Sequence, residues 1–151
     1  MTRVAYTVAL CTHNHADRLA RTLGDLRALQ SPRAPWELLV IDNGCTDATS
    51  DLLATQQWPA GWRVRVVPEA KLGLSNARNC AIREATGEYL IFIDDDETPD
   101  PDWLCAYERL IDTKAPDAFG SRIEVLFEGE RPAWLRDDRL GLTALAGLMC
   151  A

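Results

Sequence analysis

Three consecutive carboxylates, Asp94, Asp95 and Asp96, stand directly after a short apolar segment, residues 89–93. The segment is β-branched and aromatic and follows Gly87, which predicts a strand buried on both faces. Side chains alternate along a strand, so an extended backbone would point Asp94 and Asp96 to one side and Asp95 to the other. Two carboxylates on one side form a hard oxygen site for Mg²⁺ or Mn²⁺, which usually shares such a site with substrate phosphates. The alternative is an acidic turn that only makes the end of the strand soluble.

Segments with the periodicity of strands and of helices alternate along the chain. The strand patterns cover residues 4–11, 36–41, 64–67, 89–93 and 118–127, and the helical patterns cover residues 16–29, 46–56, 75–87 and 103–112. Thr46 and Ser75 are expected to be helix N-caps, and Gly87 a left-handed C-cap. The alternation predicts an α/β fold with three layers, in which a mainly parallel central sheet lies between helices.

Polar residues follow three of the predicted strands, at residues 12–15, at residues 42–44 and at the three aspartates. Ligands of parallel α/β sheets bind outside the carboxyl ends of the strands, so we expect a site where these segments meet. Asp42 ends a strand, where it can accept a hydrogen bond from a base N–H or a ribose hydroxyl. Arg78 lies early in a helix and can contact phosphate or base. A turn aspartate and a surface arginine are the alternatives for these two residues.

The composition is that of a globular protein, with 47% hydrophobic and 26% charged residues in 151, which fits most simply one domain. The net charge of −7 argues against non-specific binding to nucleic acid or an anionic membrane, because both favour a basic surface. No apolar run approaches the ~18 residues that suggest a transmembrane helix. Five widely spaced cysteines indicate reduced, buried thiols in a cytoplasmic protein, with no zinc-ligand spacing.

Several catalytic motifs are absent from the sequence. It contains no G-x-G-x-x-G dinucleotide fingerprint, no P-loop and no serine in a nucleophile elbow. His13 and His15 share one loop, where we expect polar loop residues and not metal ligands. What remains is a set of carboxylates that bind a nucleotide diphosphate through a metal ion. The metal would neutralise a diphosphate leaving group as its bond to the transferred group breaks.

Four blocks of sequence together resemble the family-2 glycosyltransferases, in that family's order and spacing. The blocks are TVALCTHN at residues 7–14, LLVIDNGCTD at residues 38–47, GLSNARN at residues 73–79 and GEYLIFIDDDETPDPDWL at residues 87–104. The resemblance covers about residues 5–127. It implies a Rossmann-like GT-A fold, a nucleotide-diphospho-sugar donor, Mn²⁺ or Mg²⁺ as cofactor, and transfer of the sugar to an acceptor hydroxyl. It also implies inversion of the anomeric centre by direct displacement.

The resemblance carries roles to the acidic residues of this chain by position. Asp94, Asp95 and Asp96 match the family's D-x-D region. Asp96 is the first choice as metal ligand, while Asp94 or Asp95 would contact the ribose or the metal.

The resemblance also assigns roles to residues on the other loops. Asp42 matches the aspartate that contacts the base, and Thr12 and Asn14 match the loop beside it. Arg78 matches the donor-side arginine. His13 departs from the family, which commonly has an aromatic residue there, and so does Cys45, which stands where serine is usual.

The family's acceptor half, with its usual base, would lie beyond residue 151. Asp137 and Asp138 are therefore only weak candidates for the catalytic base. We expect a single domain over residues 1–151, with a nucleotide-sugar-binding core in residues 1–127 and the start of an acceptor-side region in residues 128–151. The acceptor (a sugar, a lipid or a small molecule) is not readable from the sequence. The apolar residues after Leu140 are a candidate surface for homo-oligomer formation, and a peripheral position at the inner membrane face stays open.

Two other functions stay open at this point. The chain could be a non-catalytic nucleotide-binding module that needs a partner or a further C-terminal half to supply the acceptor site. It could also be a nucleotidyltransferase, although residues 12–16 lack the Gly-rich, basic loop that such an enzyme needs after the first strand.

Overall fold

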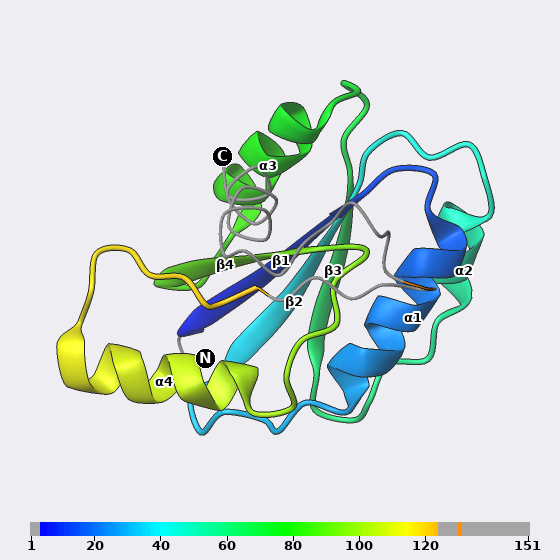
Figure 1. Cartoon of the computed structure of the whole chain (residues 1–151). Coiled ribbons are helices and arrows are strands. Elements are labelled where there is room, and N and C mark those ends of the chain that lie inside the picture. Colours follow the sequence, from blue (N-terminus) through cyan, green and yellow to red (C-terminus); the bar gives the residue numbers. More distant parts are fainter. Residues whose placement is uncertain (1–3, 124–129, 131–151) are drawn as a thin grey trace. The chain divides into compact units, whose positions relative to one another are not determined.

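The computed structural model describes residues 4–123 and residue 130 (Figure 1). The described elements are, in chain order, β1 (Tyr6–Thr12), α1 (Ala16–Arg27), β2 (Trp36–Asp42), α2 (Thr49–Thr55), β3 (Arg63–Pro68), α3 (Leu74–Glu84), β4 (Tyr89–Asp94) and α4 (Trp103–Lys114). The chain divides into two compact units, Met1–Ala115 and Pro116–Ala151, and all of these elements lie in the first. None of the described helices is long and apolar enough to cross a membrane.

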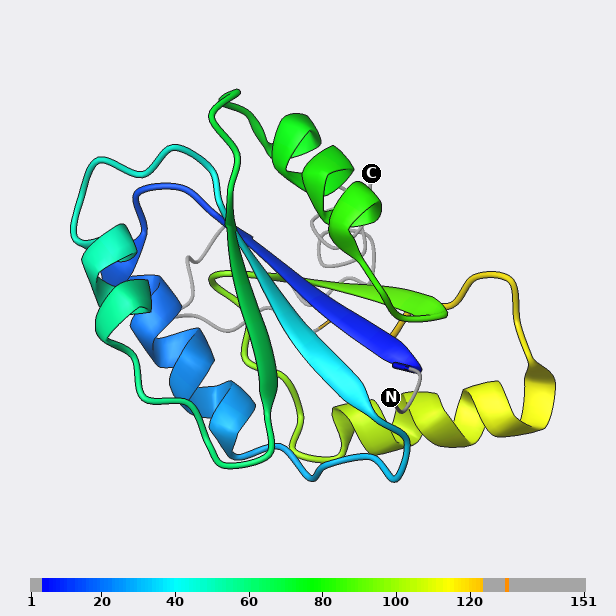
Figure 2. The same cartoon turned by 180° about the vertical axis from the view of Figure 1, so that it is seen from behind.

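The four strands form one parallel sheet in the order β3-β2-β1-β4 (Figures 1 and 2). Strand β1 is paired on both sides, with Thr12 opposite Asp42 of β2 and Cys11 opposite Asp94 of β4. The predicted α/β fold with a mainly parallel sheet is therefore confirmed. Because the strands run in the same direction, their carboxyl ends share one edge.

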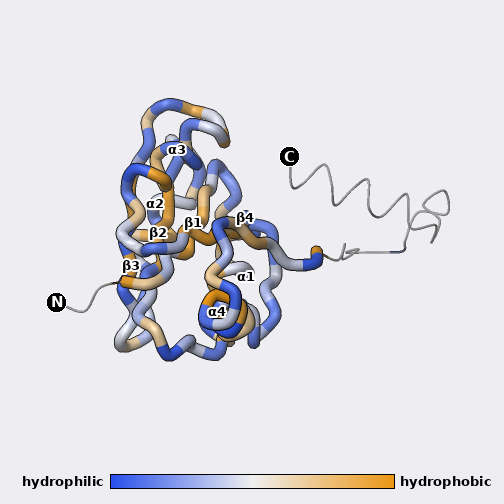
Figure 3. The backbone as a smooth tube through the Cα atoms, turned by 90° about the vertical axis from the view of Figure 1, so that its left-hand side faces the viewer, coloured by the Kyte–Doolittle hydropathy of each residue, from blue (hydrophilic) through white to orange (hydrophobic). Residues whose placement is uncertain are grey.

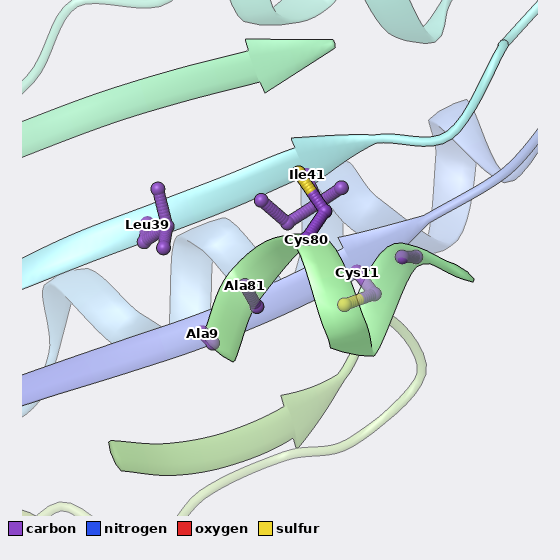
Figure 4. Close-up of a cluster of buried hydrophobic side chains, with 7 residues drawn as sticks. Ala9, Cys11, Leu39, Ile41, Cys80 and Ala81 are labelled. Atoms are coloured by element: carbon purple, nitrogen blue, oxygen red, sulfur yellow. The ribbon is translucent and has the colours of Figure 1, made fainter. Parts of the chain in front are cut away.

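Helices cover both faces of the sheet, because both sets of alternating strand residues are apolar. On one face α3 packs against β1 and β2 (Figure 4). That cluster consists of Ala9, Cys11, Leu39 and Ile41 from the strands and Ala77, Cys80 and Ala81 from α3. The intervening strand residues are also fully buried, and α1 contributes a stripe at helical spacing, Leu19, Leu23 and Leu26. Figure 3 shows hydrophobic stretches, in orange, along the strands.

Gly87 has a different role from the one predicted. Helix α3 already ends at Glu84, and the described glycines with positive φ are Gly44, Gly61 and Gly73. A Cβ atom on Gly87 would lie 2.5 Å from the backbone nitrogen of Thr7. The residue is therefore required for close approach to β1, and the predicted left-handed cap is wrong.

The two predicted N-caps are also wrong. Helix α2 begins at Thr49, and the side chain of Asp47 accepts the Thr49 backbone N–H at 3.0 Å. Thr46 lies one residue before Asp47 and does not cap the helix. Helix α3 begins at Leu74, before Ser75, and has no side-chain cap. The loops before α2 and α3 decide where these helices begin. Side chains distant in sequence, Asn14 and Asn43, hold the two loops in place.

Strand β4 is buried on only one face. Ile91 and Ile93 are buried, whereas Phe92 is 38% exposed. The prediction of burial on both faces is therefore wrong for the described residues, in which β4 is an edge strand. The strand predicted over residues 118–127 is not formed at residues 118–123, and residues 124–127 lie outside the described part of the chain.

Candidate functional site

The carboxyl ends of β1, β2 and β4 bring together the three polar segments singled out in the sequence. Thr12 lies opposite Asp42, and Asp94 lies opposite Cys11, the residue before Thr12. The His13 ring crosses to the next strand, where Nδ1 lies 2.7 Å from the Asn43 carbonyl oxygen. The predicted convergence at one edge of the sheet is confirmed.

The three aspartates do not alternate as an extended strand would require. The strand ends at Asp94, and the backbone turns through Asp95 and Asp96. The Asp94 carboxylate lies 3.2 Å from Arg78 of α3, whereas the Asp96 carboxylate lies 3.4 Å from Arg18 of α1. The prediction that Asp94 and Asp96 share one side is therefore wrong, because the turn rotates Asp96 toward the helix on the other face.

Asp95 is the buried member of the three, with 7% of its surface exposed. Its carboxylate accepts the Thr12 hydroxyl at 2.5 Å and lies 3.2 Å from Nδ1 of His15. Its backbone oxygen accepts the Thr22 hydroxyl at 3.0 Å. Asp95 therefore joins β1, α1 and β4, and Thr12 is a partner in that junction.

Asp42 is held at the end of β2 by its own turn. One carboxylate oxygen accepts the Cys45 backbone N–H at 3.0 Å, and the other accepts the Ser50 hydroxyl at 2.6 Å. Burial would raise the pKa of this carboxyl, but these hydrogen bonds outweigh it and hold the pKa below its usual value. Each carboxylate oxygen can accept a further bond, so the ionised Asp42 can still receive a ligand N–H or O–H.

Asn14 joins the loop after β1 to the loop after β2. Its side-chain oxygen accepts the Thr46 backbone N–H at 2.7 Å, and its own backbone N–H donates to the Cys45 sulfur at 3.3 Å. Asn14 has φ of 54°, a left-handed conformation that asparagine tolerates better than most residues. The polar residues 12–15 thus serve first to fix the edge of the site.

Arg78 lies on the fifth position of α3 and faces β4. Besides its ion pair with Asp94, its guanidinium stands 5.9 Å from the centre of the Phe92 ring. The side chain is 33% exposed. It is thus a positioned cation at the edge where an anionic ligand would bind.

The structure gives roles to site residues to which the sequence patterns assigned none. Asn43 is 3% exposed, and its side chain bonds to the backbone of residues 69, 71 and 73, which fixes the loop before α3. The Glu97 carboxylate accepts the Asp94 backbone N–H at 3.2 Å. Burial raises the pKa of Glu97. Arg18 pairs with Asp96. Asn43 and Glu97 directly follow Asp42 and Asp96 in the sequence, and this adjacency was the available signal for them. Their roles could not be predicted, because they depend on tertiary contacts.

A surface pocket of about 390 Å³ opens beside these loops. Residues 14–18, Asp47 and Ala48 line it. The lining carries both acidic and basic side chains, Asp17, Asp47 and Arg18.

The aspartates do not form a complete metal site by themselves. Among residues 4–123 there is no group of three or more His, Cys, Asp or Glu side chains placed to hold a metal ion. Asp96 is 42% exposed and its contact with Arg18 is long, so its oxygens are accessible. Mg²⁺ commonly takes one or two protein carboxylates and completes its shell with phosphate and water, and this donor set fits that pattern.

The described cysteines do not add a nucleophile or a base to this edge of the sheet. The described cysteines are free thiols, and burial raises the pKa of Cys11 to about 12 and that of Cys45 to about 11. Both thiols therefore stay protonated at neutral pH. Asp137, Asp138 and Cys150 lie outside the described residues.

Comparison with known proteins places this geometry in a family. Residues 7–147 match the family described as Glycosyl transferase family 2. The succinoglycan biosynthesis protein ExoM of Rhizobium meliloti is 29% identical over 130 residues, which cover 85% of this chain and 42% of ExoM. The chain thus spans about two fifths of the length of this relative.

Solved structures show the same fold. TarS of S. aureus in complex with UDP superposes with a TM-score of 0.74 at 20% identity, over 89% of this chain and 40% of TarS 1–349. The mannosyltransferase PcManGT of Pyrobaculum calidifontis, in complex with GDP-Man and Mn²⁺, superposes with a TM-score of 0.62 at 27% identity, over 74% of this chain and 33% of that protein. These likenesses confirm the GT-A, Rossmann-like type of the sheet. The chain belongs to glycosyl transferase family 2.

Proposed function

We propose that this chain is the donor-binding portion of a metal-dependent glycosyltransferase that moves a sugar from a nucleotide-diphospho-sugar to an acceptor hydroxyl with inversion. The observation that carries the proposal is the meeting of Asp42 and Asp94 at one edge of a parallel sheet, with Asp96 in the turn that follows β4. Asp94 and Asp96 are partly exposed, and each has one ion pair among the described residues, so they can exchange their partners for a ligand. UDP and GDP-Man in the solved relatives support a nucleotide ligand of this class.

Each residue at the edge is assigned a part in donor binding. Asp42 accepts a hydrogen bond from the base, and Thr12 and Asn14 hold the loop beside it. Arg78 contributes positive charge toward the diphosphate. It would either leave its ion pair with Asp94 or bind both groups at once. The prediction that Asp94 or Asp95 contacts the ribose or the metal is kept as part of the proposal.

The metal ligand in this proposal is Asp96, with Asp94 as the second candidate. A bound Mn²⁺ or Mg²⁺ would neutralise the negative charge that builds up on the diphosphate as it leaves. The Mn²⁺ in the PcManGT complex supports this choice of cofactor. Arg18 would have to leave Asp96 for the metal to bind, which costs little because an exposed ion pair contributes ~0–1 kcal/mol.

Transfer itself needs a base that accepts the acceptor's proton. The acceptor oxygen would then attack the anomeric carbon as the bond from that carbon to the diphosphate oxygen breaks, and the diphosphate leaves with the electron pair. We assign the donor-binding core to residues 1–127 and the start of the acceptor side to residues 128–151. Asp137 and Asp138 remain weak candidates for the base.

The test is a calorimetric titration of the chain with UDP, GDP, dTDP and CDP, each with and without Mn²⁺. We expect one nucleotide to bind, and to bind more tightly with the metal. Asp96→Asn should lower that metal-dependent affinity more than tenfold. Asp112→Asn is the matched control, because Asp112 is also an exposed aspartate paired with an arginine, but on α4.

Two results would contradict the proposal. One is the absence of binding by any of the four nucleotides to folded protein, and the other is equal loss of affinity in Asp96→Asn and Asp112→Asn. Donor binding without release of the sugar to any acceptor would favour the alternative of a nucleotide-binding module that requires a partner.

A further inference from the structure

His15 directly precedes helix α1, but its side chain does not cap the helix. It is the N-cap residue and makes no side-chain cap hydrogen bond, whereas Ser, Thr, Asp and Asn are the usual residues there. The Ala16 backbone N–H at the start of the helix is satisfied by Asp47 at 3.2 Å. The start of α1 therefore gives no reason for an imidazole at this position.

The His15 ring is oriented by the buried carboxylate of Asp95. Nδ1 of His15 lies 3.2 Å from both oxygens of that carboxylate, which also accepts the Thr12 hydroxyl. A carboxylate only accepts hydrogen bonds, so Nδ1 carries the proton, and Nε2 of the neutral ring is then an acceptor. The His15 side chain is 47% exposed, and Nε2 has no hydrogen-bond partner within residues 4–123.

His13, two residues earlier, provides a contrast. Its Nδ1 lies 2.7 Å from the Asn43 carbonyl oxygen, and its Nε2 lies 3.3 Å from the Asn14 side-chain nitrogen. Both ring nitrogens of His13 are thus used inside the protein. Only His15 combines a fixed tautomer with an outward acceptor, and it lines the pocket beside the aspartates.

We propose that His15, positioned by Asp95, accepts a hydrogen bond through Nε2 from a hydroxyl group of the nucleotide-sugar donor. The inference rests on the proposed function and adds a contact within the same site. An acceptor beside carboxylates complements an O–H group and not an ionised phosphate, which has no proton to donate. The hydroxyl can belong to the ribose or to the transferred sugar, and the two sources are separated by experiment.

The experiment measures dissociation constants of the wild type and of His15→Phe, which keeps a ring but removes the acceptor. The ligands are the nucleoside diphosphate that binds the wild type, its 2′,3′-dideoxy analogue and the corresponding nucleotide-sugar. If the contact is to ribose, the wild type should bind the dideoxy analogue more weakly than the parent nucleotide, and in His15→Phe this difference should be about fivefold smaller. If the contact is to the sugar, His15→Phe should lose about fivefold in affinity for the nucleotide-sugar alone.

Equal changes for all three ligands in His15→Phe, or no change for any of them, would overturn the inference and leave the proposed function standing. Failure of the folded wild type to bind any nucleotide would overturn both.

The tautomer provides a second readout, which a merely structural role of Asp95 would not change. Long-range ¹H–¹⁵N NMR spectra should show the wild-type His15 ring protonated at Nδ1. In Asp95→Asn the amide can donate to Nδ1, so the proton should move to Nε2 and the discrimination between hydroxyl and deoxy ligands should be lost. A wild-type ring protonated at Nε2 would overturn the inference, whether or not Asp95→Asn folds.

Discussion

The two ends of the sheet both carry carboxylates, and Glu37 at the amino end differs from Asp96 at the carboxyl end in burial and in bonding. At the amino end, Glu37 is 3% exposed and accepts the Thr7 hydroxyl, the Thr86 hydroxyl and the Thr86 backbone N–H at 2.8–3.0 Å. Arg65 stands 3.9 Å away from it. At the carboxyl end, Asp96 is 42% exposed, and within residues 4–123 its side chain has one ion pair, with Arg18 at 3.4 Å.

The difference separates stability from binding. A buried carboxylate with several donors is costly to disturb, because each abandoned donor would remain desolvated. An exposed carboxylate with one long ion pair contributes little to stability and can change partners. The amino end therefore fixes the strands, and the carboxyl end remains available for a metal and an anionic ligand.

The largest expected effect is at the amino end, in Gly87→Ala. The added Cβ would meet the Thr7 backbone, which cannot move without breaking the pairing of β1, so we expect a loss of about 3 kcal/mol in the free energy of unfolding. Gly24→Ala in α1 is the control, because a Cβ there meets nothing within 4 Å and should stabilise the helix by about 0.5–1 kcal/mol. Urea unfolding measures both variants, and similar stabilities would contradict the close approach at Gly87.

A smaller effect is expected in Glu37→Gln. The free energy of unfolding should fall by about 2 kcal/mol near neutral pH, because the hydrogen bonds that now go to a charged carboxylate would go to a neutral amide. Burial would raise the pKa of Glu37, but the bonds from Thr7 and Thr86 and the charge of Arg65 outweigh it, so the pKa lies below its usual value. A lowered pKa stabilises the fold above the ordinary value of 4.5, and this stability is lost as the pH falls below that value.

The difference in stability between the wild type and Glu37→Gln should therefore narrow when urea unfolding is repeated at successively lower pH, from 7 toward 3. A difference that stays constant over that range would show that the charge of Glu37 does not contribute.

At the carboxyl end, Arg78→Ala should reduce affinity for the nucleotide about tenfold, since one charge-assisted hydrogen bond is worth about 1.5 kcal/mol. The Arg78→Ala change should lower the free energy of unfolding by less than about 1 kcal/mol, because the Arg78 side chain is 33% exposed. Calorimetry and thermal unfolding on the same samples separate the two quantities. A variant that unfolds earlier but binds normally would place Arg78 among the structural residues.

The smallest expected effect is on the free energy of unfolding of Asp96→Asn, which should lie within about 0.5 kcal/mol of the wild-type value, because the ion pair of Asp96 with Arg18 is exposed. Thermal unfolding without ligand checks this value. A large loss of stability would mean that the two ends of the sheet do not differ as described.

The sequence predicted the strands and the edge of the site because their signals are local. Apolar runs such as residues 36–41 end abruptly in polar residues, and parallel pairing then brings those ends together. It did not predict how Asp94, Asp95 and Asp96 divide among Arg78, His15 and Arg18, because a turn of two residues decides the direction of each side chain.

The predicted helix starts failed for a similar reason. Asn14 holds the backbone of Thr46 and Asp47, and the Asp47 side chain then accepts the Thr49 backbone N–H, so a contact distant in sequence helps to decide where α2 begins. The requirement for Gly87 also depends on β1, some eighty residues earlier in the chain. Local patterns carry none of this information.

The most direct test of a nucleotide site at the carboxyl edge uses the paramagnetism of Mn²⁺. ¹H–¹⁵N NMR spectra of the chain are recorded with the tightest-binding nucleoside diphosphate and Mg²⁺, and again after trace Mn²⁺ is added. We predict that signals at Thr12, Asp42 and residues 94–97 broaden, while those at Glu37, Thr86 and Gly87 stay sharp. Broadening at the amino end, or no selective broadening with saturating nucleotide, would contradict the account.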